Sequence, residues 1–188
     1  MKLSEHKELK KEILGLPPKE KDKLLLRLVA KDKVLTEHLH FLLLEDESSL
    51  GDRVEEIKEQ IMESMHHLRG QRNLNAKDVL VNLRKLAKIV NHNLKVTKAN
   101  FEDVELRVFL LNHTITEFKT GIFSSFKNYE HVFASYYVKS ILVTLRKFDK
   151  LHQDLQFDLS EELNKLLIKA NGGSTASVAH SLNLPGSI

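Results

Sequence analysis

Three pairs of residues in this 188-residue chain have spacings at which a helix presents two metal ligands together. Glu63 and His66 are separated by three positions, the spacing used in carboxylate-bridged di-iron bundles. If Ile61 marks the apolar stripe of a helix, both side chains point away from that stripe. A bundle site would need them to face the interior, so this pair does not predict one.

The other two pairs are His113 with Glu117 and Asp149 with His152. The first pair also points away from the apolar stripe of its segment. Asp149 and His152 lie on the inner side of their predicted helix, but a single pair supplies only half of a metal site. We therefore predict no metal site and no cofactor.

No residue in the sequence is a candidate for a nucleophile in covalent catalysis. The chain has no cysteine, which excludes disulfides, thiolate zinc sites and cysteine nucleophiles. Ser124 and Ser125 follow Gly121 but lack the Gly-x-Ser-x-Gly pattern of a nucleophile elbow. The only adjacent glycines are at 172–173, so no glycine-rich phosphate loop is present. The sequence favours a protein that is not an enzyme.

Positive charge is concentrated in residues 66–100, which hold eight Lys or Arg and one acidic residue. A helix predicted over 77–95 carries an apolar stripe that includes Val79, Leu83 and Val90. Four cations fall opposite this stripe over about 27 Å, and a fifth flanks them. We call these five the basic face: Lys77, Arg84, Lys85, Lys88 and Lys95. Three more cations, Arg69, Arg72 and Lys98, lie just beyond its ends.

The basic face has two interpretations. It is either the solvated side of a surface helix or a binding surface for an anionic partner, which would be an acidic protein or a nucleic acid. No aromatic residue is interleaved with these cations in the sequence, so base stacking is not supplied within this helix. We expect a helical interaction or scaffold protein with a protein partner, and the alternative is a nucleic-acid-binding accessory protein.

Aromatic residues are concentrated between positions 101 and 157, which hold eight of the nine Phe and all three Tyr. Large rings at this density either fill a core where helices diverge or form a patch that binds a partner. The candidates for such a patch are Phe123, Phe126, Tyr129, Tyr136 and Tyr137.

The segment Asp22–Leu44 contains nine leucines and is apolar over most of a helical circumference. A helix of that kind must be covered on most sides. We therefore expect this segment at the centre of the fold, with the other helices packed around it. On that placement, Leu28→Ala or Leu39→Ala would each cost about 2–5 kcal/mol.

The remaining periodicity predicts an all-α fold, an irregular multi-helix bundle or a short stack of antiparallel helical hairpins, with about seven or eight helices. A turn near Asp32 divides the leucine-rich segment, although one helix over 18–45 is the alternative. Residues 47–49 are expected to form a loop. We predict a helical domain over 1–170 and a flexible tail over 171–188, which is rich in small and polar residues. The expected helices span 4–14, 18–30, 33–45, 54–70, 77–95, 101–120 (capped by Asn100), 130–152 and 161–171 (capped by Ser160).

Residues 9–44, LKKEILGLPPKEKDKLLLRLVAKDKVLTEHLHFLLL, resemble the opening of an uncharacterised all-helical bacterial family. The resemblance rests on a Lys/Glu-rich first helix, a Leu-Pro turn and a leucine-rich hairpin with a Lys-Asp pair. It implies helices and no catalytic residues. No apolar run approaches 18 residues, and the charged N-terminus does not fit a signal peptide, so we expect a cytoplasmic protein with no membrane segment.

Overall fold

The computed structural model describes residues 5–118 and 129–188. All regular secondary structure in these two ranges is helical, which confirms the predicted all-α class. The chain divides into two compact units, Met1–Glu45 and Asp46–Ile188. The predicted division into a 1–170 domain and a 171–188 tail therefore differs from the one that the structure has.

The first unit contains α1 (Lys7–Gly15), α2 (Pro18–Val29) and α3 (Lys33–Leu44). Pro18 opens α2, where the missing backbone N–H costs no helical hydrogen bond. The Asp32 carboxylate accepts a hydrogen bond from the backbone N–H of Leu35 at 3.1 Å and so caps α3. The leucine-rich segment is thus two helices, as the Asp32 turn predicts, and the single-helix alternative is wrong.

The prediction that the leucine-rich segment forms the centre of the fold was wrong. None of the three helices of the first unit contains a buried residue. The apolar pattern shows only that these helices have surface to bury, and two 12-residue helices joined at a turn cannot enclose each other. Six of the leucines are 53–75% exposed: Leu25, Leu26, Leu28, Leu42, Leu43 and Leu44.

Substitution of Leu28 should therefore have a small effect on stability. Leu28→Ala should lower the free energy of unfolding by less than about 1 kcal/mol, because the side chain is already 53% exposed. The matched control is Leu163→Ala, which removes a fully buried leucine and should cost about 2–5 kcal/mol. Urea denaturation of both variants measures the difference, and similar losses would contradict the exposed placement of Leu28.

The second unit contains α4 (Glu47–Arg69), α5 (Ala76–Thr97), α6 (Asn100–His113), α7 (Tyr129–Phe148) and α8 (Gln153–Asn171). The expected loop at 47–49 is the first turn of α4. The Asp46 carboxylate accepts hydrogen bonds from the backbone N–H groups of Ser48 and Ser49, both at 3.1 Å. An N-cap of this kind satisfies donors that a helix start leaves open, so Asp46 favours a helix that begins here.

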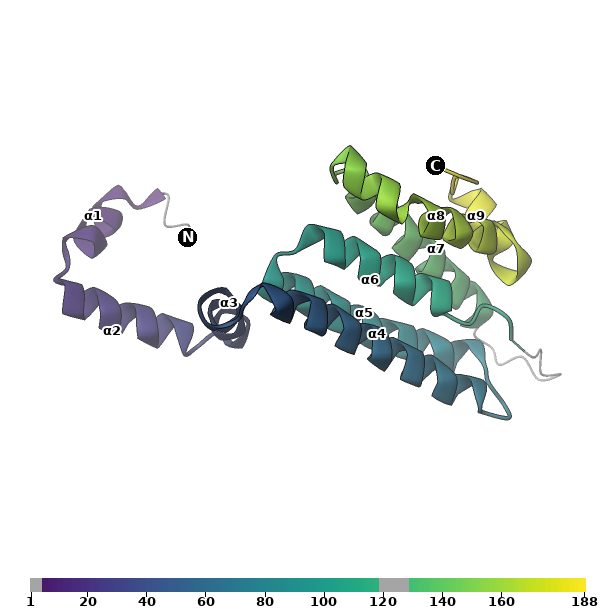
Figure 1. Ribbon diagram of the computed structural model, residues 1–188, viewed down its shortest axis with the longest axis horizontal. Coiled ribbons are helices and arrows are strands. Elements are labelled where there is room, and N and C mark those ends of the chain that lie inside the picture. The colour runs from purple at the N-terminus through teal and green to yellow at the C-terminus, as the bar shows by residue number, and fades with distance from the viewer. Residues whose placement is uncertain (1–4, 119–128) are drawn as a thin grey trace. The chain divides into compact units, whose positions relative to one another are not determined.

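The central helix of the second unit is α6. It contacts α4, α5, α7 and α8, and it lies between the α4–α5 and α7–α8 pairs (Figure 1). The predicted stripe of Val104, Val108 and Leu111 is buried, and so are Leu106 and Leu110 on other sides of the helix. A helix that buries side chains on several faces must be covered on each of them.

The C-terminal end of α6 differs from the sequence prediction. The helix expected to continue to residue 120 ends at His113, where the Lys169 ammonium of α8 donates to the carbonyls of Asn112 and Thr114, both at 2.6 Å. Burial, with a further contribution from the nearby Arg69 charge, lowers the pKa of Lys169 to about 8. A lysine from another helix thus takes carbonyls that continued helix would have used, which residue periodicity does not reveal.

The N-terminal ends of α6 and α8 also differ from those predicted. Ala99, rather than Asn100, is the N-cap of α6, and its side chain makes no capping hydrogen bond. Helix α8 begins at Gln153, seven residues before the predicted Ser160 cap. Ser160 lies inside α8, where its hydroxyl donates to the carbonyl of Phe157 at 2.8 Å.

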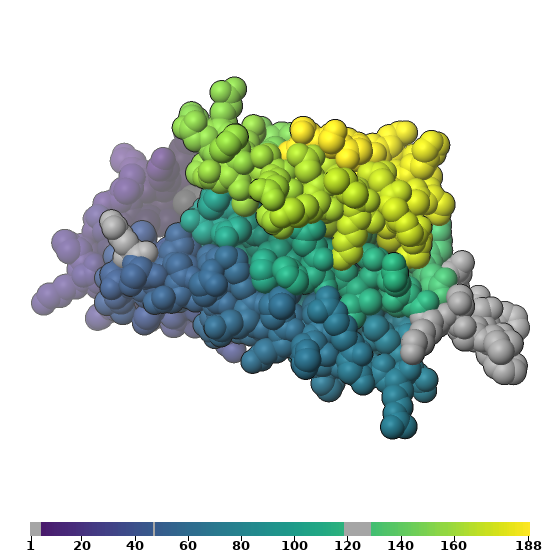
Figure 2. All heavy atoms as spheres, turned by 45° about the vertical axis from the view of Figure 1, so that its right-hand side comes forward, coloured from purple at the N-terminus to yellow at the C-terminus, as the bar shows by residue number. Residues whose placement is uncertain are grey.

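The segment predicted to be a flexible tail is folded onto the second unit. It forms a 3-10 turn, η2 (Gly173–Thr175), and a short helix, α9 (Ala176–Ser181). Val178, Ala179 and Leu184 are buried in the same core as α7 and α8. Figure 2 shows the yellow C-terminal segment against the yellow-green α8. Small and polar side chains suggested flexibility, but α9 contacts both α7 and α8.

Candidate functional site

The basic face lies on the exposed side of α5. All five of its cations are exposed. Lys85, Lys88 and Lys95 form no ion pair with any residue in the described ranges. Asp78 is the one carboxylate of the helix, and it accepts from the side chain of Asn75 at 2.6 Å. The positive charge of this face is thus largely uncompensated.

Two tyrosines of α7 lie beside the basic face. The Lys77 ammonium is 5.7 Å from the centre of the Tyr129 ring, and the Arg84 guanidinium is 5.1 Å from that of Tyr136. Cations at this distance are attracted to the negative face of the ring. The structure therefore brings together the basic and aromatic candidates, which the sequence treats as separate groups.

These two contacts define how α5 and α7 are aligned. Both the cations and the tyrosines are separated by seven residues, or about two helical turns. Residue numbers rise in the same direction on both helices, so α5 and α7 run parallel. A third pair at the same spacing would be Asn91 and Val143, neither of which is a cation or an aromatic residue.

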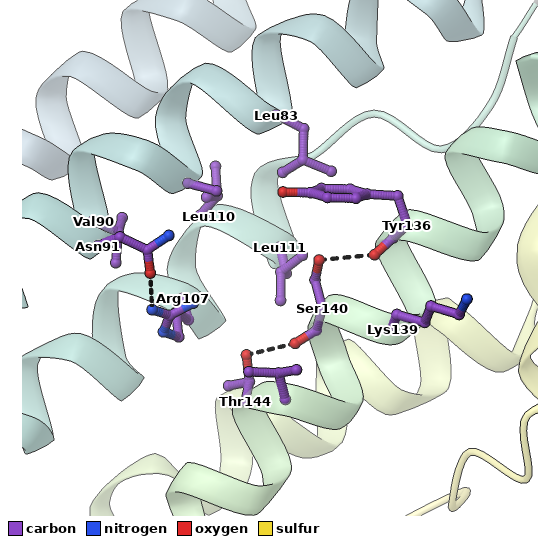
Figure 3. Close-up of a pocket in the computed structure, with 12 residues that line it drawn as sticks. Leu83, Val90, Asn91, Arg107, Leu110, Leu111, Tyr136, Lys139, Ser140 and Thr144 are labelled. Carbon is purple, nitrogen blue, oxygen red and sulfur yellow. Dashed lines mark hydrogen bonds between the residues drawn. The ribbon is translucent and has the colours of Figure 1, made fainter. Parts of the chain in front are cut away.

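A pocket of about 230 Å³ lies at this third position, between α5, α6 and α7 (Figure 3). Tyr136, Ser140 and Thr144 line it from α7, while Asn91 of α5 and Arg107 of α6 lie on the opposite side. Among the described residues, no carboxylate lines this pocket. The rest of the lining consists of Leu83, Ala87, Val90, Leu110, Leu111, Lys139 and Val143.

A buried charge cluster holds Arg107 at the edge of the pocket. One oxygen of Asp103 accepts from Arg107 Nε at 2.9 Å and from Lys147 Nζ at 2.7 Å, and the Asp103 side chain is 1% exposed. Arg107 also donates to the side-chain oxygen of Asn91. Two cations share one carboxylate, so the cluster carries a net positive charge beside the pocket.

The other predicted site residues lie away from this arrangement. Arg69 ends α4, Arg72 lies in the turn before α5, and Lys98 is the C-cap of α5 with a left-handed φ of 60°. All three are exposed. Phe123 and Phe126 lie outside the described residues.

Tyr137 cannot contact a partner, which corrects its place among the aromatic candidates. It is fully buried, and its hydroxyl donates to the carbonyl of Leu111 at 3.0 Å. Burial also raises the pKa of this phenol. Tyr137 is adjacent in sequence to Tyr136, so it points to a different side of α7.

The suspected metal ligands do not converge where the structure can be described. Glu63 and His66 are exposed, and the His113 ring packs against Phe109 with centroids 4.1 Å apart. The Nδ1 atom of His152 lies 3.2 Å from a carboxylate oxygen of Asp154, and not of the predicted partner Asp149. Within residues 5–118 and 129–188, no three His, Asp or Glu residues are grouped to hold a metal ion.

In the same ranges, no helix has the length and apolarity needed to cross a bilayer.

Sequence reasoning missed the pocket because its residues come from three helices. The Asp103–Arg107 spacing is a local signal for an ion pair on one helix, but such spacings are common on solvated helices. The parallel alignment of α5 and α7 has no signal in either helix alone.

In comparisons with known proteins, no family model matches the chain, and no curated protein or solved structure is significantly similar to it.

Proposed function

We propose that this chain is a non-enzymatic helical interaction protein that binds an acidic segment of a partner protein along the basic face of α5. The observation that carries this proposal is the row of exposed cations with a single carboxylate on the same helix. Such a surface attracts anionic partners. Binding one costs little free energy for the desolvation of carboxylates, because the surface has few of its own.

Residue types beside the basic face favour a protein as the partner. Tyr and Arg are enriched at protein interfaces, and Tyr136 with Arg84 supplies both at one place. Two exposed valines, Val81 at 59% and Val143 at 43%, add apolar contact area on α5 and α7. Apolar and aromatic contacts between charges suit a protein segment better than a row of phosphates.

A nucleic acid is the second candidate partner, and one observation favours it. The two tyrosines place aromatic rings directly beside Lys77 and Arg84, although the sequence of α5 alone offers none. Stacking on aromatic rings next to cations is how single strands are held. In this structure the cations already lie over the rings, so a base would have to displace them.

Reversing three charges of the basic face tests the proposal. Arg84, Lys88 and Lys95 would be replaced together by Glu, and partners captured from a native lysate would be identified and then reconstituted with purified protein. Three attractions become repulsions at about 1 kcal/mol each, so affinity for an acidic partner should fall about 100-fold. Fluorescence anisotropy of the labelled partner would measure this loss.

The control for this experiment reverses three exposed lysines outside α5, namely Lys19, Lys23 and Lys31. It makes the same change in net charge and should leave affinity nearly unchanged. Equal losses in both variants would show that net charge, and not the basic face, determines binding.

Nuclease treatment separates the two candidate partners. A complex with an acidic protein should survive nuclease treatment. Binding to duplex DNA would instead be lost, and its affinity, measured separately against salt, should fall with a slope of about −3 to −4 in a plot of log affinity against log salt concentration, for about four phosphate contacts. Capture that is lost after nuclease treatment would favour the nucleic-acid alternative.

The cytoplasmic location expected from the sequence stays a prediction.

A further inference from the structure

The pocket between α5, α6 and α7 occupies the place of a missing ring. Tyr129 and Tyr136 lie beside α5 at successive seven-residue steps, and the next step on α7 is Val143. Val143 is smaller than a tyrosine, and it lines the pocket together with Val90 and Leu111. A flat ring there would continue the row of tyrosines.

The size and floor of the pocket fit one aromatic ring. Its volume is about 230 Å³, and an enclosed apolar cavity of about 150 Å³ is enough to bind benzene. Leu83, Val90, Leu110 and Leu111 form the apolar floor that α5 and α6 contribute to the pocket (Figure 3). The space that remains beyond a ring accommodates a short polar substituent.

The polar side of the pocket favours a negative substituent. Arg107 has five N–H donors, of which two are bonded within the described residues, to Asp103 and Asn91. The Tyr136 hydroxyl has no hydrogen-bond partner among those residues. The hydroxyls of Ser140 and Thr144 already donate to the carbonyls of Tyr136 and Ser140 at 2.8 and 2.9 Å. The donors that are left are those of Arg107, the Tyr136 hydroxyl, the Asn91 amide nitrogen and the Lys139 ammonium, and no carboxylate among the described residues lines the pocket to repel an anion.

We propose that this pocket binds a small aromatic carboxylate, with its ring on the apolar floor beside Tyr136 and its carboxylate directed to Arg107. This ligand goes beyond the acidic protein partner proposed above. The two proposals share Tyr136 and Val143 but are tested separately, because the titration of a small ligand requires no partner on the basic face.

Titration of the full chain with phenylacetate tests the site. Two-dimensional NMR spectra should show saturable shifts confined to Ala87, Asn91, Tyr136, Val143 and their neighbours, at phenylacetate concentrations up to about 5 mM. Phenylacetamide, which keeps the ring without the charge, should bind at least about tenfold more weakly. Acetate should bind no better than phenylacetamide, since it lacks the ring.

A substitution that fills the pocket provides the second arm. Val143→Phe places a ring at the vacant step and should abolish the phenylacetate shifts. Its matched control is Val132→Phe, on the same helix and also exposed, at 42% against 43%, but not part of the pocket. The control should bind phenylacetate as the unmodified chain does.

Three results would overturn the proposal. The first is the absence of saturable shifts at the highest phenylacetate concentration, and the second is equal binding of phenylacetate and phenylacetamide. The third is shifts centred on another part of the chain, such as α1–α3. If Val143→Phe disturbs folding, the shift map and the comparison of ligands still decide the question without it. None of these results bears on the charge-reversal experiment, so each proposal can fail alone.

Discussion

Deleting residues 173–188 should lower the melting temperature of the protein by about 10 °C or more. The deletion removes η2 and α9, and with them the buried side chains of Val178 and Leu184. Each contributes about 1.5–3 kcal/mol by burial, and apolar surface of α7 and α8 becomes exposed as well. This loss is large against a total stability of about 5–15 kcal/mol. Calorimetry of the truncated chain measures it.

A shorter truncation is the control for this deletion. Removing only 186–188 leaves Leu184 in place and takes away exposed residues, so the melting temperature should change little. Leu184→Ala in the full chain should show part of the loss, about 2–3 kcal/mol. If the long and the short truncations melt together, α9 does not pack on the core.

Replacing Asp103 with Ala should cost about 3–5 kcal/mol, because it removes the one carboxylate that Arg107 and Lys147 share. Both cations would remain partly buried without an opposite charge. Asp103→Asn should cost less, since the amide oxygen can still accept from one of them. Guanidinium denaturation of the two variants separates the charge from the hydrogen bond.

An exposed ion pair serves as the comparison for Asp103. Glu161 lies 2.9 Å from Lys165 on the surface of α8, and its loss to Ala should leave stability nearly unchanged. An equally small effect of Asp103→Ala would show that water reaches this cluster. The second oxygen of Asp103, which is buried without a hydrogen-bond partner in the described chain, is where that water would bind.

Local signals in the sequence were sufficient for the helices and insufficient for their arrangement. The Asp32 cap acts within three residues, so the turn read from the sequence placed the start of α3 at residue 33, where the structure has it. The position of the centre depends on which helices cover one another. Nine leucines drew attention to the first unit, although α6, with a less apolar sequence, is the helix that its neighbours cover.

The same limit applies to the candidate site. The exposed cations of the basic face follow from the 3.6-residue period of one helix, and the structure places them as expected. The tyrosine contacts and the pocket depend on the alignment of α5 with α7, which are separated by a whole helix in the chain. Tyr136 and Tyr137 show the consequence, since one is half-buried beside the pocket and its neighbour in sequence is fully buried.

The absence of buried residues from α1–α3 determines how these helices respond to thermal fluctuation. Opening one of them exposes little new apolar surface, so the free energy of opening is far below that of the second unit. Their amide hydrogens therefore exchange with solvent through local opening, whereas those of α6 exchange only when the bundle around it unfolds. The two units of one chain thus differ in the time for which each keeps its hydrogen bonds closed to solvent.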